Sequence, residues 1–255
     1  VVGCEFREKE MVKQIPGSRW DSEPGTWSVP LSWAACCQLR GIFGVRLEVG
    51  PALNAWSRED RSARRDPCLA LREAEDSEDL SFMTALRPFQ RAGARFLSVA
   101  RHALLADEMG LGKTVQAIAA LEAIGDDAYP ALVVCPNSMK RTWADEFNRW
   151  APGRDVVVVT GGVVARKKSI ALLGTGEADV AVINYEGLRA HTRLEGYGSM
   201  TLSPEEKTAK DLNEVPIKTV IADESHRAKD PRAKQTRALW AIGRDATYRF
   251  ALTGT

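Results

Sequence analysis

Residues 107–114 read Asp107-Glu108-Met109-Gly110-Leu111-Gly112-Lys113-Thr114, with two glycines directly before a lysine and a threonine. A short apolar run at 102–106 comes before it, and a stretch of helical periodicity at 114–124 follows. A buried strand, a glycine-rich loop and a helix in this order predict a phosphate-binding loop. Backbone N–H groups of such a loop and of the helix N-terminus converge on phosphate oxygens. Gly110 and Gly112 permit backbone angles and a close approach that side chains would block.

The residue types in this loop predict how it holds ATP and Mg²⁺. Lys113 places a cation on the β- and γ-phosphates, and the Thr114 hydroxyl ligates the magnesium ion. The nucleotide contacts expected along the loop are Met109, Gly110, Leu111, Gly112, Lys113 and Thr114. The strict eight-residue pattern begins with Gly, where this sequence has Asp107. The alternative is a chance glycine-rich turn, and the flanking strand and helix argue against it.

An acidic pair follows the lysine at position 113 by 110 residues, at the end of the apolar run 219–222. In a fold with a phosphate-binding loop, an Asp at such a strand end holds Mg²⁺, usually through water. The neighbouring Glu is placed to polarise the attacking water as a general base. We therefore expect Glu224, Asp223 and Lys113 to be catalytic, and Thr114 and Asp223 to hold the metal. The alternative is an acidic turn on the surface.

From Leu86 onward, apolar runs alternate with helical stretches. The runs predicted to be strands are 102–106, 131–135, 156–159, 180–183, 219–222 and 248–252. The predicted helices between them are 114–124, 139–150, 164–173 and 234–242. Continuous apolar strands separated by helices predict an α/β domain with a mainly parallel sheet sandwiched by helices. The polar stretch 193–213 is predicted to be a loop insertion.

The first 80 residues differ from the rest. Residues 1–56 hold four of the seven tryptophans, namely Trp20, Trp27, Trp33 and Trp56. A helix near 8–14, a strand at 27–30, a helix from about 32 and the turn signals between them predict a small α+β module. Residues 57–80 are more than half charged, which predicts a solvated linker with some helix. The α/β domain then occupies 81–255.

Bulk properties narrow the class of protein. With 44% hydrophobic and 27% charged residues, the chain has enough apolar side chains for a full core. The net charge of +1 does not indicate a nucleic-acid partner, although it does not exclude a basic groove. No apolar run reaches the roughly 20 residues of a membrane helix. The five cysteines lack zinc-site spacing, so we expect reduced thiols and a cytoplasmic or nuclear compartment.

Six motifs in order resemble helicase superfamily two and, within it, the Swi/Snf-type ATPases. Their positions are 86–93, 107–114, 133–138, 182–186, 223–230 and 252–255. The second motif has the form of this family, which accounts for Asp107. Two positions depart from the usual pattern, since Asn184 stands in place of Thr and Ser225 in place of Ala or Gly. The resemblance implies a RecA-like lobe, ATP as the substrate, and DNA as the partner.

The resemblance also implies roles for single residues. Gln90 would read the adenine edge, and His226, Thr253 and Thr255 would couple hydrolysis to movement. The expected nucleic-acid contacts are Ser138, Lys140, Arg141, Tyr185 and Lys229. The first three open a helix and suit a phosphodiester backbone, although a solvated basic helix face is an equal alternative.

The N-terminal region resembles the HARP-type module of annealing helicases and of their bacterial and phage relatives, where it is linked to fork or branched DNA. Arg19 beside Trp20 suits phosphate contact and base stacking. In a very small module, however, large aromatic side chains also serve as core. We therefore expect Trp20 and Trp27 to be buried.

Superfamily-two motors use two RecA-like lobes, and the second supplies arginine fingers. No second lobe is present in this sequence, which starts with Val1 and ends inside the last motif. We expect a DNA translocase whose isolated first lobe is nearly inactive. The alternatives are an RNA or restriction-type helicase of the same superfamily, and a truncated, non-catalytic module that binds DNA or nucleotide.

Overall fold

The computed structural model describes residues 2–4, 8–65, 85–198 and 200–254. Contacts divide the chain into two compact units. One comprises Val1–Arg58 with Glu195–Lys207, and the other comprises Glu59–Leu194 with Thr208–Thr255. Each unit is treated by itself. Among the helices in the described ranges, none is both long and apolar enough to cross a membrane.

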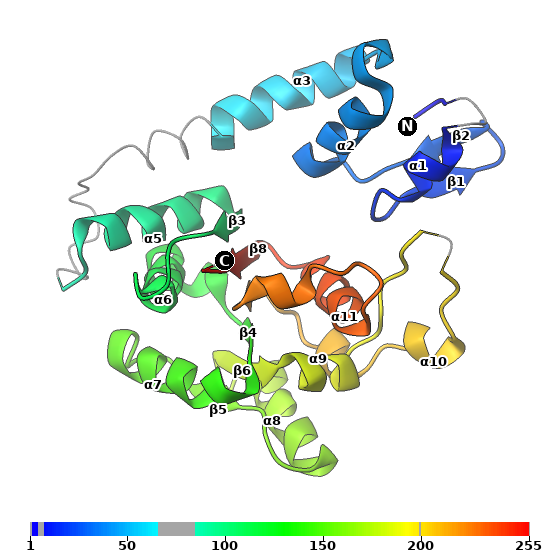
Figure 1. Cartoon of the computed structure of the whole chain (residues 1–255). Helices are drawn as coiled ribbons and strands as arrows, with labels where there is room; N and C mark the ends of the chain where they lie inside the picture. Colours follow the sequence, from blue (N-terminus) through cyan, green and yellow to red (C-terminus); the bar gives the residue numbers. More distant parts are fainter. Residues whose placement is uncertain (1, 5–7, 66–84, 199, 255) are drawn as a thin grey trace. The chain divides into compact units, whose positions relative to one another are not determined.

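The smaller unit is built on a two-stranded hairpin. Its elements are α1 (Lys9–Lys13), β1 (Arg19–Asp21), β2 (Thr26–Ser28), α2 (Trp33–Phe43), η1 (Gly44–Arg46), most of α3 (Pro51–Asp60) and α10 (Pro204–Lys207) (Figure 1). Ser32 caps α2, because its side chain accepts a hydrogen bond from the Ala35 N–H. The core consists of Val2, Val12, Ile15, Trp27, Ala35, Leu39 and Phe43. These residues form the predicted α+β module, with one strand more than predicted.

The two tryptophans of the hairpin differ in burial. They lie opposite each other in the register, with ring centroids 5.4 Å apart. Trp27 is 6% exposed and belongs to the core, as predicted. Trp20 is 54% exposed, so its prediction as a core residue is wrong. All three residues of β1 are exposed, and the core covers Trp27 but does not extend to Trp20.

The segment predicted as a charged linker begins inside a helix. The helix α3 continues to Asp60, and η2 (Arg61–Arg65) follows it directly. The rest of the predicted linker, 66–80, lies outside the described residues. In the predicted loop insertion, the structure has two short helical segments, α10 and η6 (Asp211–Glu214).

The larger unit contains six parallel strands in the order β3-β8-β7-β4-β6-β5. They are β3 (His102–Leu105), β4 (Ala131–Cys135), β5 (Val156–Val158), β6 (Val180–Asn184), β7 (Thr219–Ala222) and β8 (Tyr248–Leu252). Every strand predicted from an apolar run is present. The predicted fold class is confirmed, because a parallel sheet is flanked by helices and preceded by a small antiparallel pair (Figure 1).

Helices pack against both faces of this sheet. They are α5 (Pro88–Ala100), α6 (Lys113–Ile124), α7 (Lys140–Trp150), α8 (Val163–Thr175), α9 (Tyr185–His191) and α11 (Lys234–Gly243), joined by η4 (Gly125–Ala128), η5 (Asn137–Met139) and η7 (Ser225–Ala228). Alternate residues of β4 face opposite sides, so Val133 packs with α6 and α7 in the main core while Leu132 does not. The helices α9 and α11 pack together, against β4, β6 and β7. The middle of α6 is wholly buried, from Val115 to Leu121.

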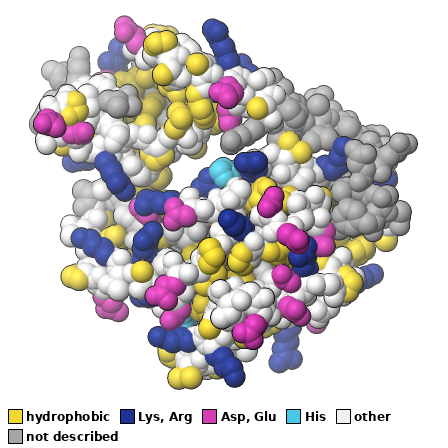
Figure 2. All heavy atoms as spheres, turned by 180° about the vertical axis from the view of Figure 1, so that it is seen from behind, with side chains coloured by type: hydrophobic (Ala, Val, Ile, Leu, Met, Phe, Trp, Pro, Cys, Tyr) yellow, Lys and Arg dark blue, Asp and Glu magenta, His cyan; other side chains and the backbone are white. Residues whose placement is uncertain are grey.

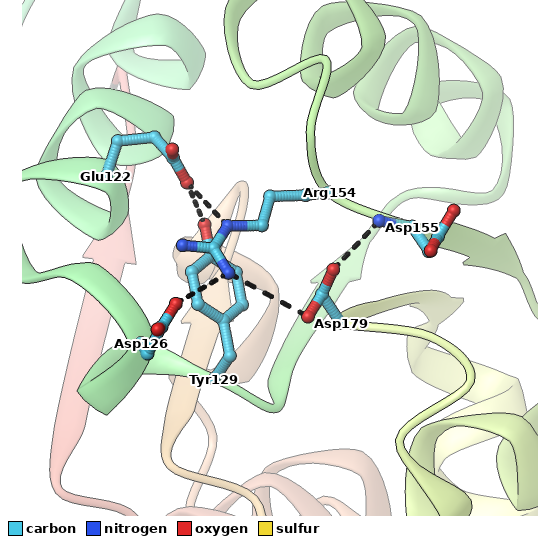
Figure 3. A network of polar contacts seen from close by, with 6 residues as sticks. All are labelled: Glu122, Asp126, Tyr129, Arg154, Asp155 and Asp179. Atoms are coloured by element: carbon cyan, nitrogen blue, oxygen red, sulfur yellow. Dashed lines mark hydrogen bonds and ion pairs between the residues drawn. The ribbon is translucent and has the colours of Figure 1, made fainter.

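An ionic cluster joins the amino ends of β4, β5 and β6 (Figure 3). The Arg154 guanidinium lies over the Tyr129 ring, 4.1 Å from its centroid. Its Nε is 3.1 Å from a Glu122 carboxylate oxygen, which also accepts a hydrogen bond from the Tyr129 hydroxyl at 2.6 Å. A second guanidinium nitrogen lies 2.9 Å from Asp126 and 3.9 Å from Asp179. One arginine therefore links segments that precede three neighbouring strands.

Candidate functional site

The loop 107–114, the acidic pair 223–224 and the last motif follow the carboxyl ends of β3, β7 and β8. Because the sheet is parallel, these ends meet at one edge, where ligands of such sheets bind. The Thr253 N–H donates to the Leu105 carbonyl at 3.1 Å. This hydrogen bond joins the residue that follows β8 to the last residue of β3. A Cβ atom on Gly254 would lie 3.3 Å from Lys113 Nζ. The last motif therefore lies against the predicted phosphate-binding loop.

The loop itself has the backbone that its glycines predict. Gly110 and Gly112 have φ angles of 84° and 74°, in the region that disfavours other residues. Gly112 is the N-cap of α6 and supplies no side-chain cap, so the first N–H groups of the helix have no side-chain acceptor there. The Lys113 ammonium donates to the carbonyls of Asp107 and Glu108, at 2.8 and 3.0 Å.

Two glutamine side chains hold the loop through hydrogen bonds. The Gln90 and Gln116 side-chain amides both donate to the Leu111 carbonyl, at 3.2 and 3.3 Å. Gln116 donates to the Asp107 carboxylate as well, at 3.0 Å. Sequence reasoning missed Gln116, although an isolated polar residue within the apolar run 115–121 was a usable signal. Gln90 also accepts from the Arg87 N–H, so its adenine contact stays a prediction.

A pocket of about 730 Å³ lies beside the loop, between α5 and β3. Its walls are mainly apolar and include Phe89, Phe96 and Leu104. Asp107, Leu111 and Gln116 form its border toward the loop. The pocket therefore adjoins the loop on the side of the helix that carries Gln90.

The acidic pair follows β7, where Asp223 makes four hydrogen bonds. Its carboxylate accepts from Trp143 Nε1 at 2.8 Å and from the Glu224 N–H at 3.0 Å. Its carbonyl accepts from the Tyr185 hydroxyl, and its N–H donates to Val134, both at 2.8 Å. Burial raises the pKa of the Asp223 carboxyl, and the bonds from Trp143 and Glu224 oppose that rise.

Glu224 has a left-handed backbone, with φ and ψ both 50°. This conformation is uncommon for a residue other than glycine, and it often marks a functional constraint. His226 Nδ1 lies 3.2 Å from a Glu224 carboxylate oxygen and 3.4 Å from the Thr253 hydroxyl. His226 thus contacts its own motif and the last motif, while its role in coupling hydrolysis to movement stays a prediction. Thr255 lies outside the described residues.

The residue types of the two predicted metal ligands, Thr114 and Asp223, suit a magnesium ion. A hydroxyl and a carboxylate, from Thr114 and Asp223, are the oxygen ligands that Mg²⁺ prefers. Each Asp223 carboxylate oxygen accepts one bond in the structure and retains further lone-pair capacity. The described residues contain no group of three or more His, Cys, Asp or Glu side chains that could hold a metal. Mg²⁺ does not need one, since it uses one or two carboxylates with substrate phosphates and water.

Three of the five predicted nucleic-acid contacts are exposed, namely Ser138, Arg141 and Lys229. The other two are not supported by the structure. Lys140 is only 8% exposed, because its Nζ turns inward and donates to the Val159 carbonyl at 3.1 Å. Tyr185 is fully buried, with its hydroxyl on Asp223. In Figure 2, basic and acidic side chains are interspersed on the face that is shown, in keeping with the small net charge.

Comparison with known proteins gives consistent matches. The SNF2-related domain matches residues 55–255. The SWI/SNF-related matrix-associated actin-dependent regulator of chromatin subfamily A-like protein 1 of Bos taurus is 30% identical over 250 residues, 96% of this chain and 24% of that protein. The DNA annealing helicase and endonuclease ZRANB3 of Homo sapiens is 34% identical over 172 residues, 67% of this chain and 14% of that protein. The chain thus spans at most about a quarter of these relatives.

Among solved structures, the Sulfolobus solfataricus SWI2/SNF2 ATPase core in complex with dsDNA matches with a TM-score of 0.54 and 29% identity. The match covers 67% of this chain and 32% of that one. The sequence match and the fold agree, since both include the six-stranded sheet and the loops at its carboxyl edge. Because the family match extends over most of its length, the chain belongs to the SNF2-related domain family.

Proposed function

We propose that this chain is the first, ATP-binding lobe of a DNA translocase, and that it hydrolyses ATP when joined to a second RecA-like lobe. The observation that carries the proposal is the arrangement at the sheet edge. Lys113, Asp223 and Glu224 follow strands of one parallel sheet, and Gly254 packs against Lys113. The family supports ATP as the substrate.

In this mechanism the loop binds the phosphates through its N–H groups and those of the first turn of α6. Lys113 exchanges its two carbonyl acceptors for phosphate oxygens. Thr114 and Asp223 would hold Mg²⁺, which when bound neutralises charge that develops on the phosphates. Glu224 orients the attacking water and accepts its proton. His226 lies within hydrogen-bonding distance of the Glu224 carboxylate and would hold it in one orientation.

We further propose that the lobe moves on duplex or forked DNA. The matching SWI2/SNF2 core was solved with dsDNA, and one relative is named a DNA annealing helicase. Ser138, Arg141 and Lys229 are exposed and suit contacts with a phosphate backbone. In the small unit, the exposed Trp20 stands beside exposed Arg19, which supports a second DNA contact by stacking.

Two substitutions test the ATP site. Lys113→Ala removes the cation and should abolish binding of a fluorescent ATP analogue to the chain. Glu224→Gln should preserve that binding. In the two-lobed protein, both variants should abolish hydrolysis stimulated by duplex or forked DNA. The isolated chain should hydrolyse ATP slowly, because an arginine finger from a second lobe contributes roughly 10³–10⁵ in rate.

Matched controls are the exposed residues Lys168 and Glu205, changed to Ala and Gln. Both control variants should bind and hydrolyse as the parent does. If the parent chain does not bind the analogue, or if Lys113→Ala binds it normally, the ATP-site assignment is wrong. Stronger stimulation by RNA than by either DNA would favour the alternative helicase branch, and binding without turnover in the two-lobed protein would favour a non-catalytic module.

A further inference from the structure

We propose that Gln116 is a positioning residue for the phosphate-binding loop, and that Gly93 is glycine because it must admit the Gln116 amide. The inference rests on the proposed function, since it concerns how the same loop is held ready for phosphate. It adds Gln116 of α6, which lies outside the six motifs, and gives a physical reason for the glycine at position 93 of α5.

The first observation is that one side chain bridges both ends of a short loop segment. The Gln116 amide nitrogen donates to the Asp107 carboxylate at 3.0 Å and to the Leu111 carbonyl at 3.3 Å. Between these two anchors lie Glu108, Met109 and Gly110, whose backbone must present N–H groups to phosphate. The second amide bond to Leu111, from Gln90 at 3.2 Å, fixes the far anchor from another helix.

The second observation is that Gln116 is a poor choice for packing alone. It is fully buried in a helix whose neighbouring positions are apolar and also buried. Its amide oxygen has no hydrogen-bond partner in the described part of the chain. Burying an amide oxygen without a partner costs free energy. An aliphatic side chain would avoid this cost. The two hydrogen bonds donated by the amide nitrogen are therefore the reason that a glutamine occupies this position.

The third observation concerns the space that this amide occupies. A Cβ atom placed on Gly93 would lie 1.8 Å from the Gln116 amide oxygen and 2.9 Å from its amide carbon. Gly93 lies within α5, where glycine lowers helix stability relative to alanine. The structure therefore accepts a weaker helix, and the missing side chain leaves room for the amide.

Asp107 gains a role from the same arrangement. The usual pattern has glycine at this position, and here the carboxylate is the acceptor for Gln116. The Asp107 carbonyl also accepts from Lys113. Asp107 thus links the positioning amide to the phosphate-binding cation, and all three groups would shift together if the amide moved.

The test combines Gln116→Ala, Gly93→Ala and the double variant. Hydrogen exchange without nucleotide should be faster over 108–112 in Gln116→Ala, because the loop loses two hydrogen bonds. Affinity for a fluorescent ATP analogue should fall about tenfold, the equivalent of one hydrogen bond to a charged group. Gly93→Ala should weaken binding similarly by displacing the amide. The double variant should be no weaker than Gln116→Ala, since the new methyl then occupies the vacated space.

Ile118→Val is the control, because Ile118 is fully buried in the same helix and has no polar role. It should lower the melting temperature without changing exchange in the loop or nucleotide affinity. Unchanged exchange and affinity in Gln116→Ala would overturn the inference, as would additive losses in the double variant. Failure of the parent chain to bind the analogue would instead refute the proposed function, while the exchange measurement would still decide the role of Gln116.

Discussion

Replacing Trp143 by Phe tests whether the tryptophan serves the acidic site or only the core. Trp143 is fully buried and donates its indole N–H to the Asp223 carboxylate at 2.8 Å. A hydrogen bond to a charged group contributes about 1.5–3 kcal/mol, and the lost ring volume adds about 1 kcal/mol. We therefore expect the free energy of unfolding to fall by about 3 kcal/mol.

The predicted effect on the metal has two opposing parts. Without the donor, the Asp223 carboxylate becomes more basic, which favours a cation, but it also loses its fixed orientation. Loss of such an outer partner typically weakens metal affinity by about 10–100-fold, so orientation should dominate. We expect the Mg²⁺ concentration for half-maximal binding of a fluorescent ATP analogue to rise about tenfold in Trp143→Phe. Equilibrium denaturation and a magnesium titration measure the two effects.

The pH dependence of the free energy of unfolding tests whether the Trp143 hydrogen bond stabilises the ionised form of Asp223. Burial raises the pKa of Asp223 in the folded chain, and loss of the indole donor raises it further. When a carboxyl has a higher pKa in the folded chain than in the unfolded chain, the free energy of unfolding falls as the pH rises from the lower pKa to the higher one. The stability difference between the parent and Trp143→Phe should therefore shrink on acidification, as the carboxyl becomes neutral.

Phe147→Leu is the matched control. Phe147 is fully buried in the same helix and packs near the Trp143 ring, at 6.2 Å between centroids. This variant should lose stability and keep the parent's magnesium dependence. If Trp143→Phe also keeps that dependence, Trp143 is a core residue only and does not serve the acidic site.

Two further predictions concern groups away from the loop. Arg154→Ala should lower the free energy of unfolding by about 2 kcal/mol, between the values for exposed and buried ion pairs, and Arg154→Lys by less, as measured by urea denaturation; equal stability of the alanine variant would show that the cluster in Figure 3 contributes nothing. Burial raises the pKa of the Cys135 thiol to about 12, so iodoacetamide at pH 8 should modify the exposed Cys37 and leave Cys135 intact until the chain unfolds. Mass spectrometry of peptides from the native chain checks this, and early modification of Cys135 would contradict it.

The sequence predicted the centre of the sheet well because β4, β6 and β7 are buried on both faces. Runs such as 131–135 contain only apolar residues, and each is followed by a Pro, Gly or polar turn that ends it. The strand β1 gave no such signal, because Arg19-Trp20-Asp21 is exposed at every position. Trp20 was predicted to be buried on residue type alone. A two-stranded hairpin, however, is too small to bury all four tryptophan side chains of this module.

The candidate site was predictable where its residues are neighbours in sequence. The loop 107–114 and the acidic pair 223–224 carry their chemistry in consecutive residues, which a motif can capture. Trp143 and Asp223 are 80 positions apart, so their hydrogen bond depends on the folded sheet. For Lys140 the sequence predicted an exposed side chain, whereas the structure buries it. A basic residue at the start of a helix suggested a surface, yet its long apolar stem lets the ammonium reach an interior carbonyl.

The bonds around Asp223 have a consequence for communication within the lobe. Its carboxylate is bound by a side chain of α7, and its carbonyl by a side chain of α9. The start of α7 also carries the exposed Arg141, a predicted DNA contact. If DNA displaces α7 and so alters the affinity at Asp223 by some factor, thermodynamic linkage requires nucleotide to alter the affinity for DNA by the same factor. In that case Asp223 would couple the proposed nucleotide site to the proposed DNA contact.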